Sequence, residues 1–158
     1  MKIKVGFGFD VHQLKEKELL ILGGVNIPHH KGTVAHSDGD VVIHAICDAL
    51  IGAAGLGDIG HFFPDNNVQY KNIDSKILLV EVFKQIQKKG YKISNIDVSI
   101  VLEKPKLKEY IPNMKNKISR CINSSNDVIN IKATTSEKLG FIGKEEGIAC
   151  YATALISN

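Results

Sequence analysis

The chain has few cysteines, one arginine and no long apolar run, and each scarcity excludes a class of protein. Cysteine occurs only three times, at Cys47, Cys121 and Cys150. These residues are odd in number, far apart and set among apolar neighbours. We therefore expect reduced core thiols and a reducing compartment, and we exclude a disulfide framework and a cysteine-type zinc site.

Charge of one sign is not concentrated anywhere along the chain. Twenty basic and seventeen acidic residues give a net charge of +3, and Arg120 is the only arginine. The scattered lysines form no stripe that would follow a nucleic-acid backbone, so we expect no nucleic-acid partner. A run of about 18 uncharged apolar residues is also missing, so we expect no membrane span.

The first residues lead directly into a predicted strand, with no signal peptide before it. We therefore expect a cytoplasmic protein of a bacterium. The alternative is the lumen of a plastid or apicoplast, if a transit peptide has been removed.

The length of 158 residues and the 44% of hydrophobic residues fit one catalytic domain, 1–158. Hydrophobic periodicity predicts strands at 2–12, 19–27, 93–103, 128–133 and 147–157, and helices at 38–54, 75–89 and 112–122. This alternation predicts an α/β fold (an α+β sandwich), with a mixed β-sheet and helices on one face. Apolar residues on the other face need a cover, so we expect an oligomer.

A motif near the N-terminus has the composition of a metal site. Asp10 and His12 are two residues apart, so in a strand both side chains leave the same face. His44 lies in the apolar stretch 41–47, which predicts a buried helix that presents a third ligand to this strand. Two imidazoles, one carboxylate and an open position form a ligand set of catalytic zinc. The alternative for Asp10 and His12 is a polar strand end without an ion.

Two carboxylates flank His44 on the predicted helix. Asp40 and Asp48 stand four residues before and after it, and residues four apart are neighbours on a helix surface. An apolar helix seldom carries such polar groups unless a partner satisfies them. Either carboxylate could orient the imidazole through its second nitrogen, and the sequence does not decide between them.

Three further stretches have polar groups suited to a site. The segment 57–67 is rich in glycine, proline and asparagine, which predicts an irregular loop that lines a site or is a plain connection. The segment 132–138 offers hydroxyls, backbone N–H groups and Glu137 to a phosphate and a hard cation, and a helix N-cap is its alternative. Lys104 and Lys106 either hold an anion or face solvent. The chain has no P-loop, and Gly6-Phe7-Gly8 lacks the third glycine of a dinucleotide motif.

Short motifs follow one another in a fixed order along nearly the whole chain. They are Gly8-Phe9-Asp10-Val11-His12, Leu22-Gly23-Gly24-Val25, Ala35-His36-Ser37-Asp38-Gly39-Asp40, His44-Ala45, Asp48-Ala49-Leu50-Ile51-Gly52-Ala53, Gly57-Asp58-Ile59-Gly60, Phe63-Pro64-Asp65, Lys132-Ala133-Thr134-Thr135 and Leu139-Gly140-Phe141. Together they resemble the 2-C-methyl-D-erythritol 2,4-cyclodiphosphate synthase family of the non-mevalonate isoprenoid pathway. The combination is far more specific than any one motif.

The resemblance implies a metal-dependent phosphorus–oxygen lyase. The reaction of the family is an intramolecular phosphoryl transfer that converts 4-diphosphocytidyl-2-C-methyl-D-erythritol 2-phosphate into 2-C-methyl-D-erythritol 2,4-cyclodiphosphate and releases CMP. The resemblance also implies a homotrimer with each site between neighbouring subunits, which would cover the open face of the sheet.

Metal ligands are assigned by the same resemblance. Asp10, His12 and His44 match the zinc ligands of the family, in agreement with the pattern described above. Glu137 matches the ligand of a second divalent ion, Mg²⁺ or Mn²⁺. The expected cofactors are therefore Zn²⁺ and one of these two ions.

The resemblance assigns the catalytic and substrate-binding groups as well. His36 and Thr135 match positions credited with transition-state stabilisation, and Ser37 lies beside the diphosphate. The expected methylerythritol contacts are Asp58, Ile59, Gly60, Phe63, Pro64, Asp65, Asn66 and Asn67. The expected cytidine pocket is Leu102, Glu103, Lys104, Pro105, Lys106, Leu107, Lys108, Ala133 and Thr134. The other expected substrate contacts are Val11, Ser136, Phe141 and Lys144, together with Asp10, His12 and Glu137.

Two departures from the family pattern stand out. Lys144 occupies a position where many members carry an arginine associated with anion binding on the trimer axis, and lysine lacks the bidentate fork of arginine. Asn66 and Asn67 replace the more usual Thr-Asp after Phe63-Pro64-Asp65.

Two other functions are alternatives to the synthase. A zinc-dependent phosphohydrolase would use a metal-bound water and accept simple phosphate esters. A non-enzymatic trimer that binds prenyl diphosphates would keep Phe141 and a central cavity but would not need Asp10, His12 and His44 together.

Overall fold

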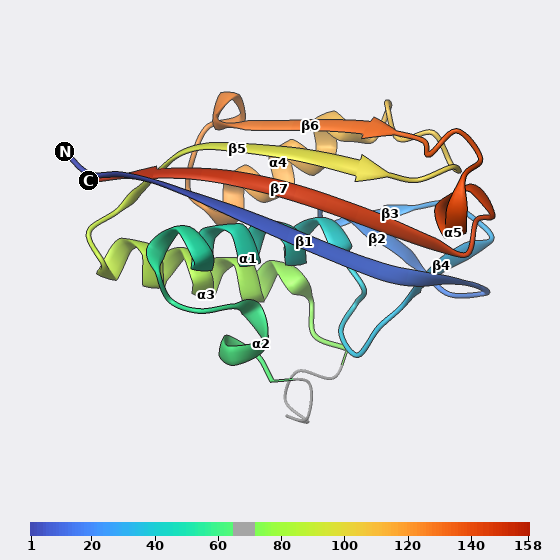
Figure 1. Ribbon diagram of the computed structural model, residues 1–158, viewed down its shortest axis with the longest axis horizontal. Coiled ribbons are helices and arrows are strands. Elements are labelled where there is room, and N and C mark those ends of the chain that lie inside the picture. The colour runs from blue at the N-terminus through green and yellow to red at the C-terminus, as the bar shows by residue number, and fades with distance from the viewer. Residues whose placement is uncertain (65–71) are drawn as a thin grey trace.

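The computed structural model describes residues 1–64 and 72–158, which form a large sheet with helices packed on it and a small second sheet (Figure 1). The elements in chain order are β1 (Ile3–Glu16), β2 (Leu20–Leu22), β3 (Val25–Ile27), β4 (Lys31–Val34), α1 (Val41–Ala54), α2 (Ile59–Phe62), α3 (Ser75–Lys88), β5 (Lys92–Val101), α4 (Ile111–Cys121), the 3₁₀ turn η2 (Asn126–Val128), β6 (Ile129–Thr134), α5 (Gly140–Gly143) and β7 (Gly147–Ser157).

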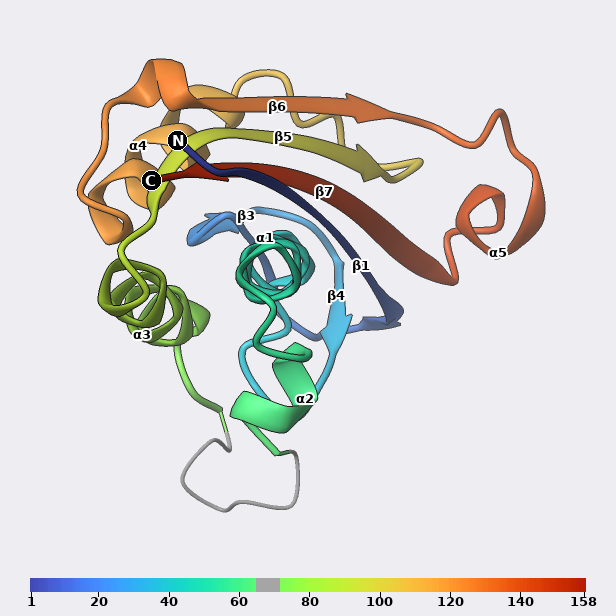
Figure 2. The ribbon, with the colours of Figure 1, turned by 60° about the vertical axis from the view of Figure 1, so that its left-hand side comes forward.

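The sheet has five strands in the order β4-β1-β7-β5-β6. β5 and β6 are parallel, and the other pairs are antiparallel, so the sheet is mixed. Figure 2 shows α1, α3 and α4 beneath this sheet, all on the same face. The predicted α/β class, with helices on one face of a mixed sheet, is therefore confirmed.

The segment 19–27, predicted as a strand with a bulge or bend at Gly23-Gly24, forms a two-stranded hairpin of β2 and β3. The single strand is wrong, and the bend at the glycines is confirmed as a full turn. Gly23 and Gly24 join the strands with φ of 57° and 74°. Two consecutive left-handed residues give the tight turn that reverses a strand and matches its twist. The short strand β4 was not predicted, and the segment predicted as an irregular loop contains α2.

The helix predicted from residue 38 begins later, at Val41, because Asp40 is its N-cap. The buried Asp40 carboxylate accepts hydrogen bonds from the N–H groups of Ile43, Gly23 and Gly24 at 3.0, 2.9 and 2.6 Å. Burial raises the pKa of Asp40 to about 6, although these hydrogen bonds oppose the rise. One side chain thus starts α1 and ties it to the β2–β3 hairpin.

The packing of α1 on β1 leaves no space for a side chain at two glycines. A Cβ atom at Gly6 would lie 1.9 Å from the carbonyl oxygen of Ala49, and one at Gly8 would lie 2.0 Å from that of Ala45. The backbone of the helix therefore rests directly on the strand, an approach that only glycine permits.

The opposite face of the sheet carries apolar side chains that are exposed in the single chain. On β1 these are Ile3, Val5, Phe7, Phe9 and Val11, and on β7 Tyr151, with exposed fractions between 40% and 63%. The Phe9 and Tyr151 rings pack at a centroid distance of 5.1 Å. An apolar patch of this kind is typical of an interaction surface.

The three cysteines are free thiols, as expected, with Cys47 and Cys150 buried and Cys121 partly buried. Within 1–64 and 72–158, none of the helices has both the length and the apolar character needed to cross a bilayer.

The close contact of α1 and β1 predicts opposite effects for two glycine-to-alanine substitutions. Gly8→Ala must push the helix away from the strand, and we expect it to lower the free energy of unfolding by about 1–3 kcal/mol or more, as overpacking does. Gly52→Ala is the control: its Cβ meets nothing within 4 Å. We expect it to stabilise α1 by up to about 1 kcal/mol. Urea denaturation checks both, and equal stabilities of the two variants would contradict this account.

Candidate metal centre

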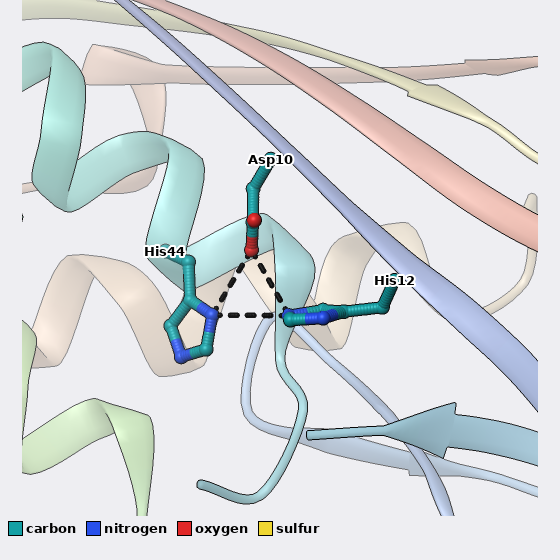
Figure 3. A group of neighbouring side chains, drawn as sticks. All are labelled: Asp10, His12 and His44. Carbon is teal, nitrogen blue, oxygen red and sulfur yellow. Dashed lines mark hydrogen bonds and ion pairs between the residues drawn. The ribbon is translucent and has the colours of Figure 1, made fainter. Parts of the chain in front are cut away.

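Asp10, His12 and His44 meet at the end of the contact between β1 and α1. Asp10 and His12 lie on the same face of β1 as Gly8, and His44 lies in the first turn of α1, next to Ala45. Asp10 Oδ2 is 3.0 Å from His12 Nε2 and 3.0 Å from His44 Nδ1, and the two nitrogens are 3.3 Å apart. Figure 3 shows the three side chains pointing toward one another.

The spacing of these three atoms fits a metal ion. Ligands at zinc–ligand distances of about 2.0–2.2 Å around a tetrahedral ion lie roughly 3.3–3.6 Å apart. The observed separations of 3.0 to 3.3 Å are only slightly shorter. The three residues form a group of ligand atoms that could hold one ion.

The charge of Asp10 suits the same use. Burial raises the pKa of Asp10, but hydrogen bonds from His12 and His44 outweigh it and bring the pKa to about 2. Burial lowers the pKa of His44, but Asp10 together with Asp40 and Asp38 raises it, and the net change is upward. The carboxylate is therefore ionised at neutral pH, which is the form that binds metals.

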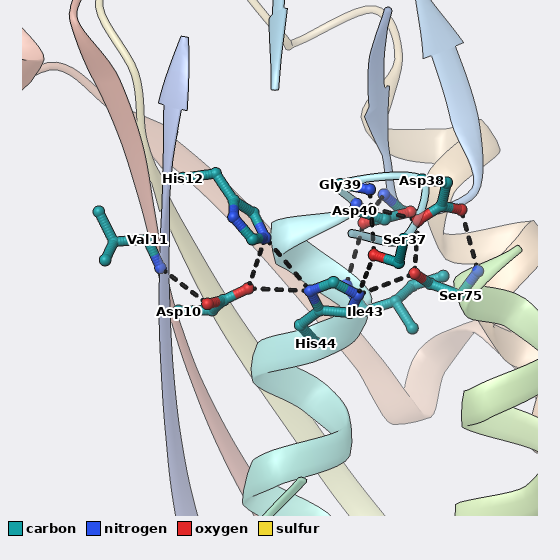
Figure 4. A network of polar contacts seen from close by, with 11 residues as sticks. Asp10, Val11, His12, Ser37, Asp38, Gly39, Asp40, Ile43, His44 and Ser75 are labelled. Carbon is teal, nitrogen blue, oxygen red and sulfur yellow. Dashed lines mark hydrogen bonds and ion pairs between the residues drawn. The ribbon is translucent and has the colours of Figure 1, made fainter. Parts of the chain in front are cut away.

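A buried chain of hydrogen bonds reaches the other nitrogen of His44 (Figure 4). Its Nε2 lies 2.9 Å from Ser75 Oγ and 3.2 Å from Ser37 Oγ. Ser75 Oγ donates to Asp38 Oδ1 at 2.5 Å, and the Ser75 N–H donates to Asp38 Oδ2 at 2.9 Å. Because Ser75 gives its hydrogen to Asp38, it accepts one from Nε2. This order keeps a proton on Nε2, so an ion that displaces the proton of Nδ1 would find that nitrogen's lone pair directed at the space between Asp10 and His12.

Neither Asp40 nor Asp48 orients the His44 ring in the described chain, so that prediction is wrong for both. Asp40 caps α1, and Asp48 Oδ1 accepts the N–H of Ile59 at 3.1 Å. Each carboxylate instead satisfies backbone N–H groups at a helix start, which lack partners within their own helix. The actual partner, Ser75, belongs to α3 and carries no sequence signal of this role.

A pocket of about 250 Å³ opens beside the three side chains. Its lining residues are Phe9, Asp10, His12, Ala35, His36, Ser37, His44, Ile59, Gly60, Phe63, Ile73 and Leu78. The expected contacts His36, Ser37, Ile59, Gly60 and Phe63 thus lie around the metal centre. The sequence did not indicate Phe9, Ala35, Ile73 and Leu78, which are apolar residues brought in by packing.

A second pocket, of about 310 Å³, lies elsewhere, between the end of β5 and the start of α4. Its lining residues are Leu102, Glu103, Pro105, Lys106, Leu107, Lys108, Ile111, Ala133, Thr134 and Thr135. The residues expected around cytidine therefore gather in one place, apart from Lys104, which pairs with Glu145 at 3.2 Å.

The segment after β6 is a turn, so its helix N-cap alternative is wrong. The Glu103 carboxylate accepts the N–H groups of Ser136 and Lys138 at 2.9 and 3.2 Å, and α5 begins only at Gly140. Glu137 lies in this turn with a φ of 55°. The Glu103 side chain therefore stabilises the turn through the backbone N–H groups of the turn.

The remaining expected contacts lie outside the two linings. Asp58 caps α2 through the N–H of His61, at 2.9 Å. Residues outside both linings are Val11, Pro64, Ser136, Glu137, Phe141 and Lys144. Asp65, Asn66 and Asn67 fall outside the described residues. Within one chain, Thr135 and Glu137 do not line the pocket of Asp10, His12 and His44.

The fold and the site define an α/β protein with a candidate metal centre in the lining of a pocket. The chain belongs to the YgbB family, whose sequence model matches residues 3–157. It is 59% identical to the 2-C-methyl-D-erythritol 2,4-cyclodiphosphate synthase of Haemophilus ducreyi, over 98% of this chain and 97% of that protein. The synthase of the same name from Bacteroides fragilis is also 59% identical, over 99% of each chain.

Solved structures agree with these relatives. IspF of Plasmodium falciparum, in a CDP complex, matches with a TM-score of 0.86 at 38% identity, over 98% of this chain and 95% of that one. The bifunctional IspDF of Campylobacter jejuni matches with a TM-score of 0.94 at 42% identity. That match covers 98% of this chain but only 42% of the bifunctional protein. The family resemblance found in the sequence is thereby confirmed.

The hydrogen-bond chain behind His44 predicts a loss of metal affinity when Ser75 is replaced. Ser75→Ala removes the acceptor of the Nε2 proton, and we expect the affinity for Zn²⁺, used as the probe ion, to fall about 10–100-fold. Calorimetric titration of metal-free protein measures the change. Ser94→Ala is the control, since the Ser94 side chain is exposed and its hydroxyl hydrogen-bonds to that of Ser157. An unchanged affinity in Ser75→Ala would contradict the assigned role.

Proposed function

We propose that this chain converts 4-diphosphocytidyl-2-C-methyl-D-erythritol 2-phosphate into 2-C-methyl-D-erythritol 2,4-cyclodiphosphate and CMP, and so serves isoprenoid precursor synthesis. The observation that carries the proposal is the meeting of Asp10, His12 and His44 in the lining of a pocket, in a chain 59% identical to synthases of this name. A carboxylate, two imidazoles and an adjoining pocket suit a metal-assisted reaction of an anionic substrate.

Asp10, His12 and His44 would hold Zn²⁺, and Glu137 would hold a second ion, Mg²⁺ or Mn²⁺. When bound, such ions neutralise the charge of a diphosphate and polarise the attacked phosphorus. Asp38 and Ser75 would keep the proton of His44 on Nε2, so that Nδ1, which faces Asp10, is free to bind the ion.

The reaction needs positioning more than proton transfer. A phosphate monoester loses its second proton near pH 6, so the 2-phosphate is already an anionic nucleophile at neutral pH. One of its oxygens bonds to the β-phosphorus, and the bond from that phosphorus to the oxygen of the α-phosphate breaks, so CMP leaves with the electron pair. The remaining task is to align the two ends of one molecule. His36 and Ser37, which line the first pocket, and Thr135, which lines the second, would hold phosphate oxygens.

The second pocket would hold the cytidine. Its apolar part comes from Leu102, Leu107 and Ile111, and its polar part from the segment around Ala133 and Thr134. The solved relative from Plasmodium falciparum is a CDP complex, which supports a nucleotide-linked small molecule as the ligand.

The two pockets of one chain support a homotrimer with shared sites. The proposed reaction needs His44 and Thr135 at one substrate, yet they line different pockets of the single chain. If the exposed apolar face of β1 and β7 packs against neighbouring copies, the first pocket of one copy can meet the second pocket of the next. A closed ring would then build three such sites.

Two finer expectations belong to the same proposal. Phe141 is 47% exposed, and with Lys144 it would contribute to a cavity on the trimer axis, where the lysine offers a single charge to an anion. The cytoplasm of a bacterium is the proposed location, in keeping with the bacterial relatives.

The decisive experiment measures CMP release from the cytidylyl substrate with Zn²⁺ and Mg²⁺, followed by phosphorus NMR of the product. We expect CMP and a cyclic diphosphate from the native chain, and a loss of turnover of at least about 10³-fold in His44→Ala, as when a catalytic metal is removed. A linear diphosphate would identify water as the nucleophile and favour a zinc-dependent phosphohydrolase. If metal-loaded protein released no CMP, the result would favour the alternative function, a non-enzymatic trimer that binds prenyl diphosphates.

Shared sites predict that two inactive variants restore each other. His44→Ala and Thr135→Ala damage different pockets, so each homotrimer should have low activity. After the subunits of an equal mixture are exchanged, about a quarter of the sites should combine two intact halves. The measured CMP release should then reach about that fraction of the native rate. Mixed protein no more active than its components, with exchange verified by mass spectrometry, would place each site within one chain.

A further inference from the structure

A second group of metal-ligating side chains lies beyond the C-terminal end of β1, away from the residues of the first centre. His29 and His30 come from the connection between β3 and β4, and Glu145 from the connection between α5 and β7. One ligand atom of each lies within 4.8 Å of those of the other two. None of the motifs that carry the family resemblance includes these residues, and neither pocket is lined by them.

The backbone around this group is fixed by hydrogen bonds. The carbonyl oxygen of His30 accepts the N–H of Lys17 at 3.0 Å. The carbonyl oxygen of Glu145 accepts Lys31 Nζ at 3.0 Å, and that of Glu146 accepts the N–H of Leu14 at 2.9 Å. The first connection is thus bonded to Lys17, just after β1, and the second to Leu14 of β1 and Lys31 of β4. The three side chains therefore do not meet merely by the movement of free loops.

The orientation of His30 favours a metal ligand. Its Nδ1 lies 3.0 Å from both carboxylate oxygens of Glu16, the last residue of β1. A carboxylate that accepts one imidazole N–H fixes the tautomer and leaves the other nitrogen as a donor of its lone pair to an ion. The ring of His29 lies beside it, with a centroid distance of 4.4 Å.

Glu145 has an unusual backbone conformation for a residue with a side chain. Its φ is 56°, in the left-handed region that favours glycine. Backbone strain of this kind is often kept at functional positions. Its carboxylate is shared with a cation, since Lys104 Nζ lies 3.2 Å from Oε1. A carboxylate has two oxygens, so Lys104 and a metal ion can contact Glu145 together.

We propose that His29, His30 and Glu145 bind a divalent zinc ion at the surface, independently of the centre at Asp10. Two imidazoles and one carboxylate repeat the donor set of the first centre and leave a position for water or another ligand. An ion there shares Glu145 with Lys104, and its positive charge weakens the attraction between Lys104 and the carboxylate. Lys104 lies between Glu103 and Pro105, both of which line the second pocket, so occupancy of the surface site weakens one ion pair beside that pocket.

The test is calorimetric titration of metal-free protein with Zn²⁺ alone, in a His12→Gln/His44→Gln background that removes the first centre. We expect this background to keep one zinc equivalent per chain. Adding His29→Gln and His30→Gln should abolish that equivalent or weaken it at least tenfold, and adding Glu145→Gln should weaken it as well. The matched control is His61→Gln, which replaces an exposed histidine outside both groups and should leave the titration unchanged.

Two results would overturn the proposal. One is a background protein that binds no zinc although circular dichroism shows that it is folded. The other is a titration that is the same with and without His29→Gln and His30→Gln, which would place the zinc elsewhere. Because the readout is stoichiometry and affinity, a failure of the proposed synthase activity would not affect the result.

Discussion

The direct contact between the backbones of α1 and β1 is the constraint on which the rest of the structure depends. Gly6 and Gly8 remove the side chains that would keep the helix and strand apart. The distance between helix and strand and the position of the helix along the strand are therefore fixed. This brings His44 Nδ1 within 3.3 Å of His12 Nε2. The same period of two that faces the glycines inward also faces Asp10 inward. The packing of α1 on β1 therefore sets the ligand geometry, because a shift of the helix would separate the ligand atoms.

Buried polar contacts then fix the positions of α1, the β2–β3 hairpin and α3 relative to one another. Asp40 begins α1 and holds the β2–β3 hairpin through backbone N–H groups. Asp38 holds Ser75 of α3, which in turn contacts the His44 ring. Buried polar groups are costly unless they are all satisfied, so such contacts exclude alternative packings of the same apolar surfaces. The metal centre is therefore supported from the strand, from its own helix and from a neighbouring helix.

The sequence predicted much of the fold and part of the site. Hydrophobic periodicity located α1, α3, α4 and the long strands, because these elements bury one face each. It missed β4 and the split of 19–27 into β2 and β3, since three- and four-residue strands are too short to show a period. It offered Asp40 or Asp48 as the partner of the His44 ring because proximity along a helix was the only information available. Ser75 is 31 residues from His44, and no local pattern indicates which distant hydroxyl will face a given ring.

By itself, the sequence determined the family, the inward face of β1 and a set of candidate site residues, because motif order and strand alternation are properties of the linear chain. Only the tertiary structure decided which of these residues meet. It joined Asp10, His12 and His44, placed His36 with them, and left Thr135 with a second pocket. It also brought His29 and His30 to Glu145, more than a hundred residues later in the chain. The physical reason is that convergence of distant side chains depends on how helices and loops pack on the sheet, which is set by shape and burial across the whole fold and not by spacing in sequence.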